Sequence, residues 1–240
     1  MKILALDTSS VVATVAVLED EKLVGEYTLN HKLTHSQKLI PMIEELMMSC
    51  ELRPRDIDIF AVALGPGSFT GLRIGAATIK AMAQALGKPV VGIPTLEALA
   101  NNLLYSGDLI CPIIDAQKNL VYSAVYSWQH SEFVEIKQQE VYEIGELIKH
   151  LRGLGRKIIF VGDAVDKHRE EIVLGLGEYA IIPPLAVRMP KAASIALLAL
   201  KRAKAGEIKG AGELVPIYMR KSQAENQYDD KLKAVVDGGM

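Results

Sequence analysis

The sequence has 240 residues, half of them hydrophobic and only 5% aromatic, so a largely aliphatic core in one large domain or two small ones is expected. It has 27 basic and 29 acidic residues. Proteins that bind the phosphates of nucleic acid usually have an excess of basic residues, which this sequence lacks. Cys50 and Cys111 are too few for a disulfide framework. Without a signal-peptide core or a long apolar run, a cytoplasmic protein with no membrane contact is predicted.

The first half predicts a meander of three strands, followed by alternating helices and strands. Short apolar runs between polar turns indicate the strands, and apolar residues at helical spacing indicate the helices. The predicted strands are 2–6, 11–18, 23–29, 57–64 and 90–93, and the predicted helices are 34–50, 71–86 and 94–104.

The second half repeats this layout. LALDTSSVVATVAV and CPIIDAQKNLVYSAVY each place an aspartate, Asp7 or Asp115, after a first strand. This self-similarity indicates a duplication and predicts two ββαβα lobes, 1–106 and 107–220, with a ligand cleft between them. Residues 221–240 are expected to be a flexible tail. The remaining predicted elements are strands 109–114, 120–128, 132–141 and 157–161, helices 144–151 and 190–205, and an extended segment 214–219.

The turn after the first strand is one candidate for binding a nucleotide. Asp7, Thr8 and Ser9 offer hydroxyls and backbone N–H groups to a phosphate. Asp7 is also suited to holding Mg²⁺ through water. An ordinary polar turn between two strands is the alternative, because these residue types are common in turns.

The segment GPGSFTGLRIG, residues 65–75, is the second candidate. It follows a strand and opens a helix, which is the setting for phosphate capture at a helix N-terminus. Gly67 and Ser68 would make the contacts. The segment matches neither the Walker A loop nor the Rossmann fingerprint, so nucleotide binding stays one of two open interpretations.

The helices predicted at 34–50 and 71–86 carry more apolar surface than one sheet requires. Methionines flank the main stripe of the first helix, and alanines cover much of the second. Gly71 and Gly75 make sense where another backbone approaches closely. The surplus indicates either an interface with another subunit or simply a larger core.

Six segments carry a resemblance to a known family. They are LALDTS, THSQKLIPMI, ALGPGSFTGLRIG, GIPTLEALA, IIDAQKNLVYSAVY and VPIYMRK. Together they resemble the TsaB (YeaZ) family, over roughly residues 1–130 and again near 215–221. The resemblance implies the two-lobed α/β fold of the actin-like ATPases (the ASKHA superfamily), with duplicated ribonuclease H-like lobes.

The resemblance also implies a function. TsaB is a non-catalytic subunit that supports TsaD, together with the small ATPase TsaE, in threonylcarbamoylation of the adenosine beside the anticodon in tRNA. Thr95 and Leu99 stand where TsaD has two metal-binding histidines, and neither side chain is a useful ligand for iron or zinc. No metal site, no catalytic residue and only indirect contact with tRNA are therefore expected. ATP or ADP with Mg²⁺ would be bound chiefly by TsaD and TsaE.

In this family two helices of the first lobe form the interface with TsaD, and with a second copy in the homodimer formed when TsaB is alone. Carried onto this sequence, the interface residues are Leu39, Met42, Ile43, Leu46, Met47, Gly71, Leu72, Gly75, Ala76, Ile79 and Ala83. The alternative function is an ATP-binding small-molecule kinase of the same superfamily.

Overall fold

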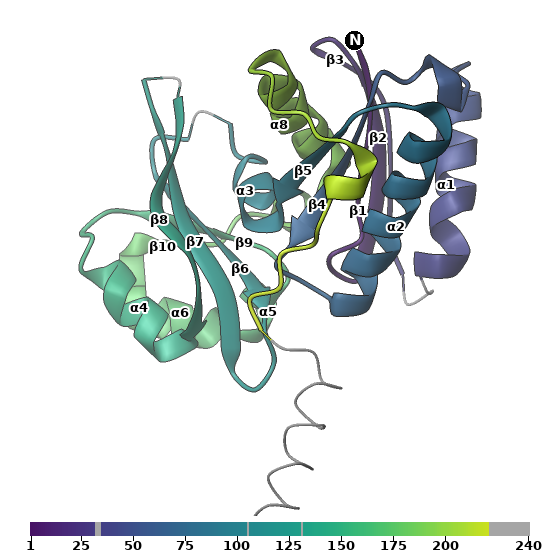
Figure 1. The fold of residues 1–240 in the computed structure, drawn as a ribbon. Helices are drawn as coiled ribbons and strands as arrows, with labels where there is room; N and C mark the ends of the chain where they lie inside the picture. The colour runs from purple at the N-terminus through teal and green to yellow at the C-terminus, as the bar shows by residue number, and fades with distance from the viewer. Residues whose placement is uncertain (32–34, 105, 131, 221–240) are drawn as a thin grey trace, which may run out of the picture.

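The computed structural model describes residues 1–31, 35–104, 106–130 and 132–220. They form two lobes, each built on a five-stranded sheet (Figure 1). The flexible tail predicted at 221–240 lies outside the described residues. Within the described ranges, no helix combines the length and apolarity needed to cross a bilayer.

The first sheet has the strand order β3-β2-β1-β4-β5. The meander β1–β3 is antiparallel, as predicted, whereas β4 and β5 run parallel to β1. The two inner strands of the meander are buried along almost their whole length, because both faces of the sheet are covered. The bounds are β1 (Lys2–Asp7), β2 (Val12–Glu19), β3 (Lys22–Asn30), β4 (Ile59–Gly65) and β5 (Val90–Pro94).

The second sheet repeats this topology, with the order β8-β7-β6-β9-β10. β6 and β7 are antiparallel, and β9 runs parallel to β6. The predicted duplication of ββαβα lobes is therefore confirmed. The bounds are β6 (Leu109–Asp115), β7 (Leu120–Gln129), β8 (Glu132–Glu143), β9 (Ile158–Val161) and β10 (Ala180–Ile181).

The helices follow the predicted alternation, with additions. α2 begins before the predicted position 71 because Ser68 caps it, accepting a hydrogen bond from the Gly71 N–H at 3.3 Å. Several short elements fill 164–189, a stretch with no prediction. The bounds are α1 (His35–Ser49), α2 (Phe69–Leu86), α3 (Thr95–Ala100), α4 (Ile144–Arg152), α5 (Ala164–Lys167), α6 (Arg169–Leu176), α7 (Leu185–Arg188) and α8 (Ala192–Lys204), with 3-10 turns η1 (Pro54–Asp56), η2 (Gly177–Tyr179) and η3 (Ala211–Glu213).

Each lobe has three layers. In the first, α1 and α2 pack on one face of the sheet, where Leu4, Leu6 and Val15 lie in the same cluster as Leu39 and Ile79. α8 covers the opposite face (Figure 1). In the second lobe, α4 and α6 cover one face, and α3 of the first lobe supplies buried residues to the other.

The division at 106/107 needs one correction. α8 was predicted within the second lobe, but its Ile195 and Ala199 pack against Ile3 and Ala5 of the first sheet. The first sheet is apolar on both faces, so a helix from the end of the chain must return to cover it. The segment 214–219, which was predicted to be extended, pairs with no sheet; it runs from the first lobe toward the second (Figure 1).

This assignment of α8 can be tested with Ile195→Ala. Ile195 is fully buried in the first lobe, so the cavity should lower the free energy of unfolding by about 3 kcal/mol. Hydrogen exchange should accelerate in β1 before it accelerates in β6. Val173→Ala on α6, where the side chain is 48% exposed, is the control and should cost little. Faster exchange confined to the second sheet would contradict the assignment.

Candidate functional site

The turn between β1 and β2 brings three of the nucleotide-binding candidates together. Asp7, Thr8 and Ser9 are each about 1% exposed. The Asp7 Oδ1 accepts a hydrogen bond from the Ser9 N–H at 2.6 Å, and burial raises the pKa of the Asp7 carboxyl. His35, at the start of α1, has its Nε2 2.7 Å from the Ser10 carbonyl oxygen. The turn is thus held from within the chain.

The other two candidates, Gly67 and Ser68, lie directly against this turn. The Ser68 N–H donates to the Ser9 carbonyl at 2.6 Å, and the Thr8 hydroxyl donates to the Gly71 carbonyl at 2.7 Å. The structure therefore brings all five candidates together. Three of their donors, the Thr8 hydroxyl and the N–H groups of Ser9 and Ser68, are engaged in this contact, whereas the Ser9 Oγ is buried and has no hydrogen-bond partner among the described residues. A phosphate cradle requires several donors that point at the ligand.

Gly67 and Gly71 allow this contact. A Cβ at Gly67 would overlap the carbonyl oxygen of Ser9, and a Cβ at Gly71 would overlap that of Thr8. Gly67 also has φ +158°. Gly67 and Gly71 therefore allow α2 to approach the turn between β1 and β2 of the same chain.

The matching turn of the second lobe is more open. Asp115, the counterpart of Asp7 at the end of β6, is exposed and forms an ion pair with Lys167 at 2.8 Å. Its N–H donates to the Asp163 Oδ1 at 3.1 Å. Burial raises the pKa of Asp163. The two halves of the cleft are therefore chemically unequal.

Residues 214–220, which we call the strap, connect the two lobes. The Ile217 N–H donates to the Leu64 carbonyl at 2.7 Å. Tyr218 packs on Phe69 with ring centroids 4.7 Å apart, and the Arg220 guanidinium donates to the Ala116 carbonyl. The strap thus contacts both the start of α2 and the turn after β6, so a ligand spanning the two turns would compete with it. In the sequence, this segment is marked by its extended pattern and by its resemblance to the family.

The predicted interface residues point inward. The side chains of Leu39, Ile43, Leu46, Leu72 and Ile79 are at most 3% exposed. The rest of the predicted set, Met42, Met47, Gly71, Gly75, Ala76 and Ala83, is also buried. These residues pack on their own sheet and turn, because a stripe at helical spacing marks the face toward the core. An interface on these helices remains a prediction, but other residues must form it.

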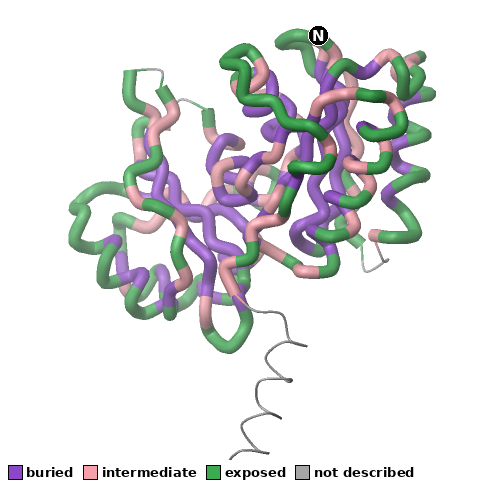
Figure 2. Tube along the Cα trace, viewed as in Figure 1, coloured by how far each residue is buried: buried purple, intermediate pink, exposed green. Residues whose placement is uncertain are grey.

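The outward faces of α1 and α2 carry the residues free to meet a partner. On α1, Ile40 is 45% and Met48 is 78% exposed. On α2, Ala77, Ala81 and Ala85 are exposed at four-residue spacing. Figure 2 shows these helices as alternating buried and exposed bands, and Figure 1 shows them side by side on the same face of the first sheet. Small side chains in a row let another helix approach closely.

Thr95 and Leu99 have structural contacts in this chain. The Thr95 hydroxyl accepts a hydrogen bond from the Gly65 N–H at 3.1 Å, which ties α3 to the end of β4. Leu99, which is 2% exposed, packs in the cluster between the lobes.

Comparison with known proteins identifies the family. Residues 22–228 match the family model described as TsaD, tRNA N6-adenosine threonylcarbamoyltransferase. A Bacillus subtilis protein named tRNA threonylcarbamoyladenosine biosynthesis protein TsaB is 31% identical over 97% of this chain and 100% of its own length. The chain belongs to the TsaB family. The TsaB of Escherichia coli is 25% identical over 93% of this chain and 96% of its own length. A role in tRNA threonylcarbamoyladenosine biosynthesis follows.

Solved structures agree on the fold. YeaZ from Pseudomonas aeruginosa has a TM-score of 0.75 at 23% identity, covering 90% of this chain and 99% of its own. A second Pseudomonas aeruginosa structure, described as having similarity to peptidase YeaZ, has a TM-score of 0.76 at 23% identity, covering 91% and 99%. With the duplicated topology, they confirm the predicted two-lobed α/β fold with duplicated ββαβα lobes.

The contact between turn and helix predicts a large cost for Gly71→Ala. The new Cβ would overlap the Thr8 carbonyl, so the free energy of unfolding should fall by about 2 kcal/mol. Gly145→Ala on α4 is the matched control, because its Cβ would meet nothing within 4 Å. In urea unfolding, the free energy of unfolding of this control should equal that of wild type or lie slightly above it. Equal effects of the two substitutions would contradict the assigned contact.

The buried Asp7 predicts an unusual dependence of stability on pH. Its folded-state pKa is raised, so its contribution is present at low pH and is lost as the pH rises above about 4, the unfolded value. Asp7→Asn keeps an acceptor for Ser9 and should unfold at a higher urea concentration at neutral pH. Asp166 has a lowered pKa because Arg188 bonds to it, so Asp166→Asn should unfold at a lower urea concentration than wild type at neutral pH. If the Asp7→Asn variant unfolds at a lower urea concentration than wild type at neutral pH, the carboxylate has a cationic partner.

Proposed function

We propose that this protein is the non-catalytic subunit that binds and supports a TsaD homologue in threonylcarbamoylation of the adenosine beside the anticodon in tRNA. The exposed alanine row of α2, together with the exposed Ile40 and Met48 of α1, carries the proposal. It offers a close-packing helical surface that the described residues leave exposed. In this proposal a TsaE homologue joins the pair in the cytoplasm, tRNA is contacted only through the assembly, and the same face forms a homodimer when the chain is alone.

We also propose that the protein catalyses no step of the reaction itself. Thr95 and Leu99 are engaged in packing and in a hydrogen bond within the chain, and neither can replace a histidine as a metal ligand. The Thr8 hydroxyl and the Ser9 carbonyl bond to the start of α2, and the Asp7 carboxylate bonds to the Ser9 N–H. These two observations favour a subunit in which the actin-like scaffold serves docking.

The same observations weigh against the small-molecule kinase. A kinase needs free donors that hold the phosphates of its nucleotide. Here the first turn is buried, and the strap bonds to both lobes. We assign ATP or ADP with Mg²⁺ to the partner proteins. Calorimetry of the isolated chain with ATP and Mg²⁺ tests this assignment, and tight binding would overturn it.

The docking face is tested by placing one arginine on either side of α2. Ala77→Arg, on the exposed side, should keep the wild-type melting temperature and weaken binding of the TsaD homologue at least about tenfold. Ala76→Arg should unfold or destabilise the chain, because Ala76 is 4% exposed against its own core. Gel filtration and melting curves measure the two effects.

Ala186→Arg, on exposed α7 of the second lobe, serves as the control and should assemble normally. If Ala77→Arg also assembles normally, the outer face of α2 is not the interface. If the wild-type chain and the TsaD homologue elute separately and tRNA modification does not need this chain, the proposed function fails.

A further inference from the structure

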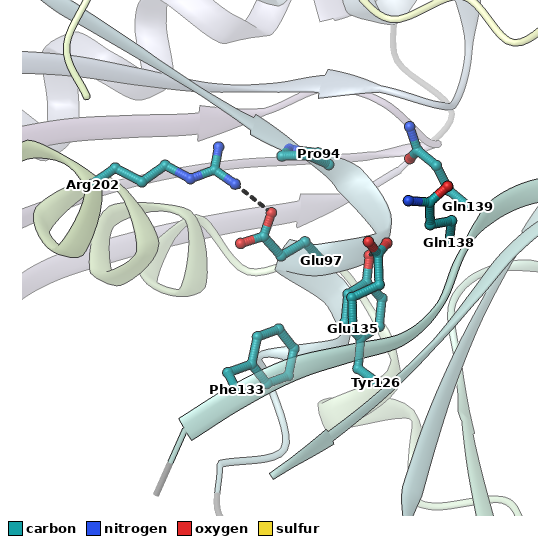
Figure 3. A pocket seen from close by; sticks show the side chains of 8 residues that line it. All are labelled: Pro94, Glu97, Tyr126, Phe133, Glu135, Gln138, Gln139 and Arg202. Carbon is teal, nitrogen blue, oxygen red and sulfur yellow. Dashed lines mark hydrogen bonds and ion pairs between the residues drawn. The ribbon is translucent and has the colours of Figure 1, made fainter. Parts of the chain in front are cut away.

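A cavity of about 600 Å³ lies between the lobes, lined on one side by α3 and α8 and on the other by β7 and β8 (Figure 3). Glu97 and Arg202 enter it from the first lobe. Tyr126, Phe133 and Glu135 enter it from the second. None of the groups assigned above to docking or to the two phosphate turns lines this cavity.

The charges of the cavity do not balance. Arg202 already has an acidic partner: its Nη2 lies 2.5 Å from the Glu97 Oε2, and its Nη1 donates to the Gly92 carbonyl at 2.7 Å. Glu135 is in no ion pair within the described part of the chain, and it only accepts a hydrogen bond from the Tyr126 hydroxyl at 3.4 Å. Two carboxylates against one guanidinium leave one negative charge.

The neutral lining adds acceptors. Neighbouring residues of a strand normally point to opposite faces, but Gln138 and Gln139 both line the cavity. The pairing of β7 with β8 shifts register between Ser123 and Val125, and this bulge redirects the two amides. The Gln139 Oε1 is buried and has no hydrogen-bond partner among the described residues.

Aromatic rings form one wall. Tyr126 and Phe133 stack with centroids 5.1 Å apart and planes 7° from parallel. Trp128 lies beyond Phe133, at 5.0 Å. Such rings accommodate an alkyl stem and attract a cation at their faces. The lining therefore combines an unpaired carboxylate, an unsatisfied amide oxygen and an aromatic wall.

We propose that this cavity binds an organic cation of the alkylguanidinium or alkylammonium class, whose N–H groups donate to Glu135 and Gln139 while its alkyl stem packs on Phe133. The pKa of Glu97 is raised by burial, and the charge of Glu135 adds to this rise. A bound cation would offset both effects. Such a cation occurs either on a free small molecule or on a Lys or Arg side chain of a partner protein.

The test uses ethylguanidinium as the probe and ethylurea as its neutral counterpart of nearly the same shape. Trp128, the single tryptophan of the chain, reports binding through its fluorescence, and the side-chain amides of Gln138 and Gln139 report it by NMR. Ethylguanidinium should bind at least about tenfold more tightly than ethylurea, since hydrogen bonds to charged groups are the stronger. Added NaCl should weaken its binding. Equal binding of the two probes, or none, would overturn the proposal.

A pair of variants locates the site. Glu135→Gln should weaken ethylguanidinium binding at least about tenfold and leave the melting temperature unchanged, because Glu135 is exposed. Glu132→Gln, at the exposed start of the same strand, removes the same charge outside the cavity and should bind normally. If both variants bind like wild type, or both lose binding equally, the cavity is not the site.

A tripeptide with a central arginine and blocked ends separates the two sources. If it competes with ethylguanidinium at equal or lower concentration, the cavity accepts a side chain of a partner protein. If it fails to compete while the small cation binds, the natural ligand is a free cation. If none of the cations binds, the proposal is overturned. The docking role of α2 is not affected by this result, because it does not depend on this cavity.

Discussion

The contact between the first turn and the start of α2 is the constraint on which the site depends. Thr8 and Ser9 exchange hydrogen bonds with Gly71 and Ser68, and the glycines provide the room. Because these groups bond to one another, the start of α2 is fixed against the turn at the end of β1. The position of α2, and hence the direction of its outer face, follows from the same contact.

The two helices of the first lobe each have two distinct faces. The inner face of α2 packs on the sheet through Leu72 and Ile79, while Ala77 and Ala81 point outward. In the second lobe, one face of the sheet is covered by α3, which belongs to the first lobe. The lobes are therefore joined by a shared core as well as by the strap.

Much of the fold could be predicted from local patterns, and the site only in part. The buried strands and α2 are marked by apolar runs and by spacing, and the five residues of the two turns do meet. Periodicity shows that Leu39 or Ile79 is buried, but it cannot tell whether the covering surface belongs to the same chain. It equally cannot say which sheet α8 covers, because that depends on contacts between residues far apart, such as Ile3 and Ile195.

The return of α8 to the first sheet also bears on the order in which the protein is made. The second sheet and its helices come from one continuous stretch, 109–188, so that core can close as soon as its own residues have left the ribosome. The first lobe begins earlier but cannot cover Ile3 and Ala5 until Ile195 and Ala199 are synthesised. The amino-terminal lobe is thus the last to be completed, and during synthesis its open apolar face is the surface most in need of a chaperone.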